Sequence, residues 1–182
     1  LADWGADSIR VGIGGGSICS TRIQTGHGVP TLQSVIDCAR AAKDMKVKLI
    51  ADGGIKNSGD MVKALAAGAD FVMAGSLLAG TTESPGDVIN TPQGKYKTYR
   101  GMASKEAQRA WKGKVSSREG ISTHIPYKGS VKDILEELSV GIRSGFSYSG
   151  ARDLKELQQF SSMLQQTGAG SKESATHILS RN

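Results

Sequence analysis

The stretch VKLIADGGIKNSGDMVKALAAGADFVMAG, Val47 to Gly75, decides the fold class. It begins with an apolar run of strand length that ends at Asp52 and finishes with a second such run at 70–75. Between the two runs, apolar residues recur at three- and four-residue steps, which predicts an amphipathic helix. A strand, helix, strand order with short connections predicts parallel strands joined by a right-handed crossover.

The same alternation extends toward the N-terminus. The run DSIRVG at 7–12 predicts a strand, and TLQSVIDCARAAKDM at 31–45 predicts a helix with Cys38 on its apolar face, where a cysteine is expected to be structural. The chain therefore contains about three strand–helix units and belongs to the α/β class. Periodicity alone leaves a closed barrel and an open, doubly wound sheet both possible.

The pattern changes after Gly75. The run GKYKTYR, with a turn at TPQG, predicts a small hairpin, and residues 101–127, called the flap below, have no sustained period and predict an irregular segment. Helices are predicted again at SVKDILEELSVGIRSG and ARDLKELQQF. Residues 1–160 are expected to form the folded domain, and residues 161–182 a flexible C-terminal tail.

Composition limits the classes of protein to which the chain can belong. With 182 residues, 38% of them hydrophobic, it can bury one core, which predicts one soluble domain. No apolar run approaches the ~20 residues that span a membrane. No signal-peptide pattern is present and there are two cysteines, so a cytoplasmic, reducing location is expected. The net charge of +6 comes with 5% aromatic residues and scattered Lys and Arg, which disfavours nucleic acid and favours small anions such as phosphates.

A glycine-rich turn, VGIGGGSICSTR at 11–22, follows the first predicted strand. Its glycines lack the spacing of a dinucleotide fingerprint, and Pro30 stands in the loop where that motif needs a helix. In a parallel barrel the carboxyl ends of the strands form the site, and a phosphate commonly binds the loops after the last two strands. Asp52 is an acceptor suited to ribose hydroxyls. The candidate phosphate donors at three strand ends are Ser17, Gly54, Gly75 and Ser76.

Four segments closely resemble one enzyme superfamily, that of inosine monophosphate dehydrogenase and guanosine monophosphate reductase. They are GIGGGSICSTR, IADGGIKNSGDMVKALAAGADFVMAGSLLAGTTESPG, YKTYRGMAS and IPYKGSV, and the resemblance covers roughly Gly5 to Leu157. It implies a (β/α)8 TIM barrel, a fold of about 250 residues, of which this chain holds the last three strands, the cysteine loop and the flap. We therefore expect the C-terminal half of the barrel of a longer enzyme, with the remaining half in cis or on another chain, and a homo-tetramer.

The resemblance also implies a covalent mechanism and a role for individual residues. Cys19 would be the nucleophile that attacks C2 of the purine, Thr21 the hydroxyl that assists proton transfer, and Glu119 the acidic flap residue at the N1 edge. Backbone carbonyls of Gly14, Gly16 and Cys19 would coordinate potassium, a hard cation that oxygen ligands suit. The implied substrate-binding residues are Ser17, Gly54, Gly75, Ser76 and Tyr99 for the phosphate, Asp52 for the ribose, and Gly101 and Met102 for the base.

The flap favours the reductase over the dehydrogenase within this superfamily. Dehydrogenases carry an Arg-Tyr pair there that activates water, and residues 101–120 contain no such pair. The expected reaction is therefore the NADPH-dependent conversion of GMP to IMP and ammonia. NAD-dependent oxidation of IMP to XMP is the alternative, with Arg100, Arg109 or Arg118 in place of the missing arginine. A noncatalytic purine-nucleotide-binding relative is a third possibility, against which Cys19 with Thr21 argues.

Overall fold

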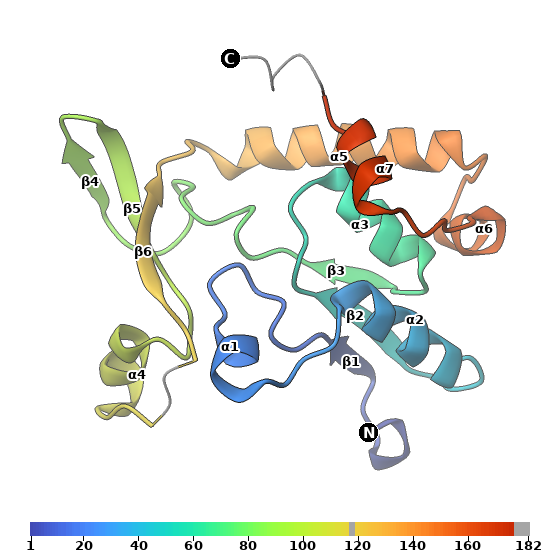
Figure 1. The fold of residues 1–182 in the computed structure, drawn as a ribbon, viewed down its shortest axis with the longest axis horizontal. Helices are drawn as coiled ribbons and strands as arrows, with labels where there is room; N and C mark the ends of the chain where they lie inside the picture. The colour runs from blue at the N-terminus through green and yellow to red at the C-terminus, as the bar shows by residue number, and fades with distance from the viewer. Residues whose placement is uncertain (117–118, 177–182) are drawn as a thin grey trace.

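The computed structural model describes residues 1–116 and 119–176 (Figure 1). Its first sheet is parallel, in the spatial order β1-β2-β3, and its strands are β1 (Ser8–Val11), β2 (Lys48–Asp52) and β3 (Phe71–Met73). The helix α2 (Thr31–Ala41) connects β1 to β2, and α3 (Ser58–Ala66) connects β2 to β3. These elements confirm the predicted strand–helix units, and the fold is α/β.

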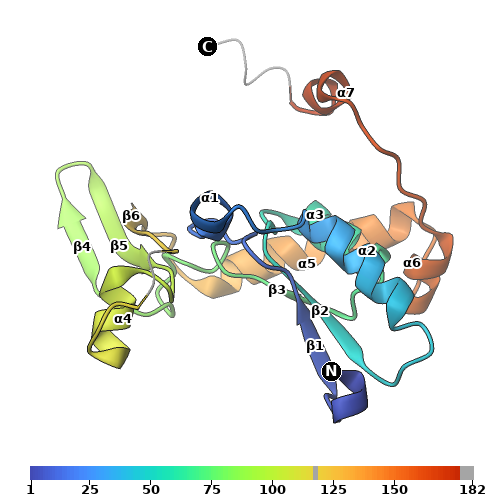
Figure 2. The ribbon, with the colours of Figure 1, turned by 60° about the horizontal axis from the view of Figure 1, so that its bottom comes forward.

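One face of this sheet is covered by α2 and α3 (Figure 2). Side chains alternate along a strand, so Leu49 and Ala51 of β2 point to this face, where they are 3% and 0% exposed. Val35 and Cys38 of α2 pack in the same apolar cluster, as expected for a structural cysteine. The other face keeps large apolar side chains open, among them Phe71 at 57% exposed. The sheet therefore has one packed face and one open face.

Two predicted helices follow later in the chain and pack on α3. They are α5 (Val131–Tyr148) and α6 (Leu154–Phe160). Close approach of α5 requires a glycine at Gly145, because a Cβ built there would lie 2.6 Å from the nearest side-chain atom of α3. The buried Leu138 of α5 lies in the same apolar cluster as Leu49 and Ala51 of β2, so α5 adds to the cover of the packed face of the sheet.

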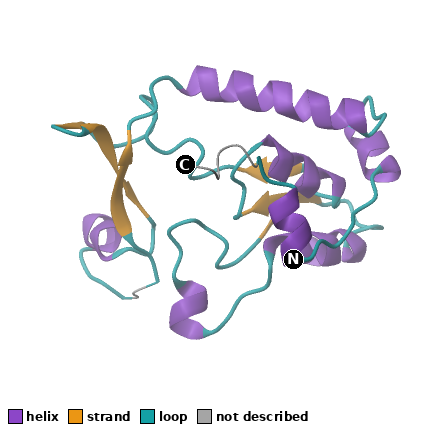
Figure 3. Cartoon of the chain, turned by 45° about the horizontal axis from the view of Figure 1, so that its top comes forward, coloured by secondary structure: helices purple, strands orange, loops and turns teal. Residues whose placement is uncertain are grey.

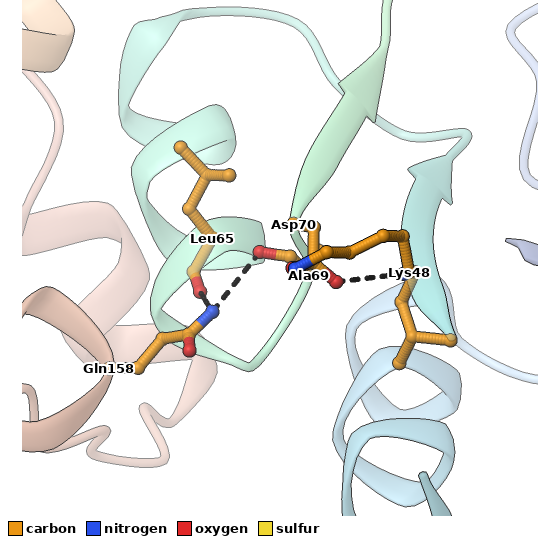
Figure 4. Close-up of polar contacts among 6 residues, drawn as sticks. Lys48, Leu65, Ala69, Asp70 and Gln158 are labelled. Atoms are coloured by element: carbon orange, nitrogen blue, oxygen red, sulfur yellow. Dashed lines mark hydrogen bonds and ion pairs between the residues drawn. The ribbon is translucent and has the colours of Figure 1, made fainter. Parts of the chain in front are cut away.

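Polar contacts fix α6 and the end of the α3–β3 connection (Figure 4). The side-chain amide of Gln158 donates to the carbonyls of Leu65 and Ala69, both at 3.2 Å. In the same region Lys48 Nζ of β2 lies 2.7 Å from Oδ1 of Asp70, the residue just before β3, and the two form an ion pair. The bonds of Gln158 tie α6 to α3 and to the connection that leads into β3.

A second sheet stands apart from the first (Figure 3). It is antiparallel, in the order β4-β5-β6, and its strands are β4 (Val88–Thr91), β5 (Gly94–Arg100) and β6 (Ser122–Pro126). The first two strands are the predicted hairpin. Within residues 101–127, the run SKEAQRAW favours a helical turn, and the helix α4 (Lys105–Lys112) confirms it. The rest of the segment is not irregular as predicted, because it contains β6. The prediction missed β6 because its residues are exposed or half-buried on both faces, so they show no apolar alternation.

The remaining elements are short. They are a turn of 3-10 helix at Ala2–Trp4, α1 (Thr21–Thr25) and α7 (Gly168–Glu173). The last of these lies within the predicted tail, buries none of its residues and stands away from α5 and α6 in Figure 2; the part of that tail at 177–182 lies outside the described residues. Among the helices that the structure describes, none is long and apolar enough to cross a membrane.

Replacing Gly68 with alanine is expected to destabilise the fold by about 3 kcal/mol, from left-handed backbone and overpacking together. The residue has φ +110°, and an added Cβ would lie 2.4 Å from Ala39 Cβ of α2. The matched control is Gly5→Ala, since Gly5 has φ +87° and no neighbour within 4 Å, and it should cost only about 1 kcal/mol. Urea denaturation of the complete protein measures both, and equal losses would contradict the packing argument.

Candidate active site

The loop that carries Cys19 leaves β1 at a glycine that no other residue can replace. Gly12 has φ +133°, and a Cβ built on it would lie 2.0 Å from the carbonyl oxygen of Asp52, so the chain passes directly over the end of β2. Residues 12–20 are called the cysteine loop below. Arg22, just beyond it, donates from Nη2 to Val29 O at 2.6 Å and to Ile13 O at 3.4 Å, which closes the base of the loop.

Three side chains predicted to be catalytic form one hydrogen-bonded chain. Cys19 Sγ donates to Thr21 Oγ1 at 3.2 Å, and Thr21 Oγ1 donates to Glu119 Oε2 at 2.8 Å. All three residues are half-buried, and Thr21 is the first residue of α1. A thiol that donates through a hydroxyl to a carboxylate has a path for its proton, and the thiolate that remains is the nucleophilic form of cysteine.

Main-chain hydrogen bonds place Glu119 beside Thr21. Ser20 N donates to Glu119 O at 2.8 Å and Ile121 N donates to Ile18 O at 3.2 Å, so the cysteine loop and the end of the flap lie side by side as a short antiparallel bridge. Gly120 lies so close to the start of α4 that a side chain would clash there: a Cβ built on it would lie 2.8 Å from Ser104 N. No sequence signal marks this pairing, and the resemblance alone pointed to the flap carboxylate.

The predicted phosphate residues come together in part. Ser17 Oγ lies 3.2 Å from Tyr99 Oη, and a Cβ built on Gly75 would lie 3.7 Å from the same phenol oxygen. The cysteine loop, the end of β3 and the strand β5 therefore converge on one point. Ser76 continues the loop after β3. Gly54 lies after β2 and lines a cavity of about 340 Å³ with residues of α2 and α3.

Asp52, the predicted ribose residue, lies at the end of β2 and forms an ion pair with Arg10 of β1, between Oδ2 and Nη1. Arg10 pairs in register with Ile50, two residues before Asp52, so both charged side chains point to the open face of the sheet. Sequence reasoning did not find Arg10. Arg10 could be identified only from the face of the sheet that it shares with Asp52, and that face is known only once the register of β1 and β2 is known.

The residues predicted to contact the base lie at the start of the flap. Gly101 is half-buried against the cysteine loop, where its added Cβ would lie 3.5 Å from Ile18 Cδ1, and Met102 beside it is 72% exposed. Of the three arginines considered for water activation, Arg100 and Arg109 are exposed, and Arg118 lies outside the described residues.

The predicted potassium ligands are main-chain carbonyls in the cysteine loop. Within residues 1–116 and 119–176, no three His, Cys, Asp or Glu residues gather as a metal site. The carbonyl of Gly16 accepts from Cys19 N at 3.1 Å and keeps a second lone pair, and Gly14 has φ +72°, which only glycine adopts readily. Main-chain carbonyl oxygens are the kind of ligand that a hard monovalent cation takes, and potassium binding by this loop stays a prediction.

Comparison with known proteins gives one consistent result. Residues 1–177 match the model of the IMP dehydrogenase / GMP reductase domain. The chain is 45% identical to an inosine-5'-monophosphate dehydrogenase of Nitrosopumilus maritimus over 95% of its length, and 45% identical to a GMP reductase of Leishmania major over 100%. A GMP reductase variant of Trypanosoma brucei, solved in complex with guanosine 5'-monophosphate, superposes with a TM-score of 0.92 at 44% identity and 97% coverage. The chain spans 39% of the length of the first two proteins and 38% of the third.

Proposed function

The chain belongs to the IMP dehydrogenase / GMP reductase family, and on that basis we propose that the complete protein is a GMP reductase, which converts GMP to IMP and ammonia with NADPH. The observation that carries the proposal is the chain Cys19 Sγ, Thr21 Oγ1, Glu119 Oε2, with distances of 3.2 and 2.8 Å. It supplies a nucleophile and a proton acceptor in one unit, as reductive deamination requires. A noncatalytic nucleotide-binding relative would not need it.

The chemistry follows from these three groups. The proton of Cys19 passes through Thr21 to Glu119, and the thiolate adds to C2 of the guanine ring. The same relay then returns a proton to the amino group on C2, which leaves as ammonia while the carbon stays bonded to Sγ. The chemistry that NADPH would supply, when bound, is a hydride to C2. The C–S bond would then break, and the released Cys19 thiolate would take up a proton to restore the resting state.

Other residues would bind the nucleotide. The phosphate would lie where Ser17 and Tyr99 meet, at 3.2 Å, next to the turn that begins at Gly75, and the ribose would pair with Asp52. Exposed apolar side chains on the flap, Met102 at 72% and Ile121 at 51%, offer a surface that suits the flat rings of a purine or a nicotinamide. We place potassium, where it binds, on the carbonyls of the cysteine loop.

The same proposal includes the rest of the barrel. The open face of the parallel sheet, with Phe71 57% and Met73 43% exposed, is what the interior of an incomplete barrel presents. The outer edges of β1 and β3 pair with no other strand in the part of the chain that the structure describes. We therefore propose that further strands, in cis or from another chain, close a (β/α)8 barrel, and that the enzyme is a tetramer.

IMP dehydrogenase is the second candidate, because relatives of that name match at the same identity as GMP reductases, 45% in both cases. Hydrolysis of its covalent intermediate needs a base that activates water. Among the described residues, Cys19 Sγ bonds to Thr21 rather than to Arg100 or Arg109, which are both exposed, and this supports the reductase as the first candidate.

One pair of assays on the complete protein separates the two activities. GMP with NADPH should give ammonia and loss of absorbance at 340 nm, a general property of the reduced nicotinamide. IMP with NAD should give no steady turnover. Sustained formation of XMP in the second assay would overturn the assignment as a reductase.

Replacing Asp52 with alanine should weaken binding of GMP much more than binding of guanine. A hydrogen bond to a charged group contributes about 1.5–3 kcal/mol, which corresponds to about 10- to 100-fold in affinity. The control is Asp37→Ala, an exposed carboxylate on α2 whose partners are Gln33 and Arg40 of the same helix rather than site residues. Calorimetric titration with each ligand measures the effect, and equal losses for the nucleotide and the base would show that the carboxylate does not bind the ribose.

A further inference from the structure

The segment after β3 begins with one helical turn whose two ends differ. Leu78 N and Ala79 N both donate to Gly75 O, each at 3.1 Å. At the start of the turn, the N–H groups of Gly75 and Ser76 donate to no acceptor among the described residues. At the other end two carbonyls accept hydrogen bonds from one ammonium: Lys128 Nζ donates to Ser76 O at 2.8 Å and to Leu77 O at 3.1 Å.

The far end of this segment is fixed without Lys128. Glu83 accepts from Val131 N at 2.9 Å, and this main-chain bond is the main cause that lowers the pKa of the Glu83 carboxyl. Lys97 of β5 is 3% exposed, and its ammonium donates at 3.0, 3.4 and 2.5 Å to the carbonyls of Thr81, Thr82 and Ser84. A change at Lys128 therefore acts on the first turn and leaves residues 81–84 in place.

We propose that Lys128 is a positioning residue for the phosphate: its ammonium holds the carbonyls of Ser76 and Leu77, so that the free N–H groups of Gly75 and Ser76 are set toward the bound phosphate. This inference rests on the proposed function, because it concerns the same phosphate site. The main chain of Lys128 supports it, since Lys128 N donates to Gly80 O at 2.8 Å and fixes the base of the side chain. Lys128 acts through the turn and does not itself touch the nucleotide.

The surroundings of the ammonium agree with this role. Partial desolvation lowers the pKa of Lys128, a residue that is exposed as a whole but whose ammonium lies against the two carbonyls. The two carbonyls replace hydrogen bonds that the ammonium would otherwise make to water. A positive charge at the carbonyl end of a helical turn also aligns with the dipole of that turn, whose N–H end attracts anions.

The test compares GMP with guanosine, which lacks the phosphate, as ligands of the complete protein. Lys128→Met keeps the apolar stem and removes the donors. It should raise the Kd for GMP at least about tenfold, the scale of hydrogen bonds to charged groups, and change the Kd for guanosine by less than about twofold. Lys128→Arg keeps the charge and donors and should restore most of the affinity for GMP. The matched control is Lys95→Met, an exposed lysine on β5, which should change neither Kd.

Each outcome has one meaning. If Lys128→Met weakens GMP and guanosine equally, or leaves the preference of the wild-type protein for GMP intact, Lys128 does not position the phosphate turn. If the wild-type protein itself binds GMP no better than guanosine, the phosphate site of the proposed function is wrong, and the inference fails with it. A selective loss for GMP, restored by arginine, supports the positioning role and no general effect on folding.

Discussion

Replacing Cys19 with alanine should lower turnover by about 10⁴-fold or more, the scale for removing a nucleophile, while GMP still binds. As a thiolate, Cys19 is the strongest nucleophile of the three groups in the chain Cys19, Thr21, Glu119, and the other two groups handle its proton. Of the proposed phosphate and ribose contacts, Ser17 lies in the cysteine loop and the others lie on other segments. None of them uses Sγ, so all remain when Sγ is removed. Loss of NADPH absorbance measures turnover, and calorimetry measures the Kd for GMP.

The matched control uses the second cysteine. Cys38 packs from α2 against the apolar cluster, away from the cysteine loop, so Cys38→Ala should keep near wild-type turnover with a modest loss of stability. A Cys19→Ala protein that still turned over near the wild-type rate would remove the covalent mechanism. Parallel loss of activity in both variants would indicate that the protein is damaged rather than its nucleophile.

The second large effect concerns the flap carboxylate. Glu119→Gln should lower the release of ammonia from GMP by ~10²-fold or more, the usual scale for loss of a general acid or base. A glutamine oxygen can still accept the 2.8 Å hydrogen bond from Thr21, so the geometry persists, but it cannot take the proton. Ammonia is measured with a coupled assay at saturating GMP and NADPH.

Two comparisons make this result specific. Glu106→Gln changes an exposed carboxylate on α4 and should leave the rate near wild type. Arg100→Ala and Arg109→Ala should show smaller defects, mostly in binding. If one of these arginines instead proved essential, and IMP with NAD gave steady XMP, the protein would be a dehydrogenase.

The parallel strands and their helices were predictable because their buried residues are apolar and recur with the period of a strand or a helix. Leu49 and Ala51 alternate with less buried neighbours along β2, and the residues of α2 and α3 that face them recur at helical steps. The strand β6 was not predictable in this way. Its partner β5 lies more than twenty residues away and its faces are exposed or half-buried, so its pairing depends on main-chain hydrogen bonds that no side-chain pattern records.

In the candidate site, too, some residues were predictable from the sequence and their partners were not. Glu119 and Thr21 are 98 residues apart in sequence, and only a resemblance to a known family suggested that they meet. Arg10 and Lys128 could not be identified from the sequence, because each is defined by what it contacts: a carboxylate on the neighbouring strand and two carbonyls of a distant turn. Residue types at strand ends can be read in advance, whereas their partners depend on register and loop geometry.

The short bridge between the cysteine loop and the flap makes these two segments one cooperative unit of local unfolding. The amide hydrogens of Ser20 and Ile121 are donated across the boundary between them, at 2.8 and 3.2 Å, so neither can exchange with solvent while the segments stay together. Any opening that exposes one amide exposes the other and also separates Glu119 from Thr21. Cys19 therefore loses its proton acceptor, Glu119, whenever the flap detaches from the cysteine loop. Without that acceptor the thiol forms the thiolate less readily and reacts more slowly.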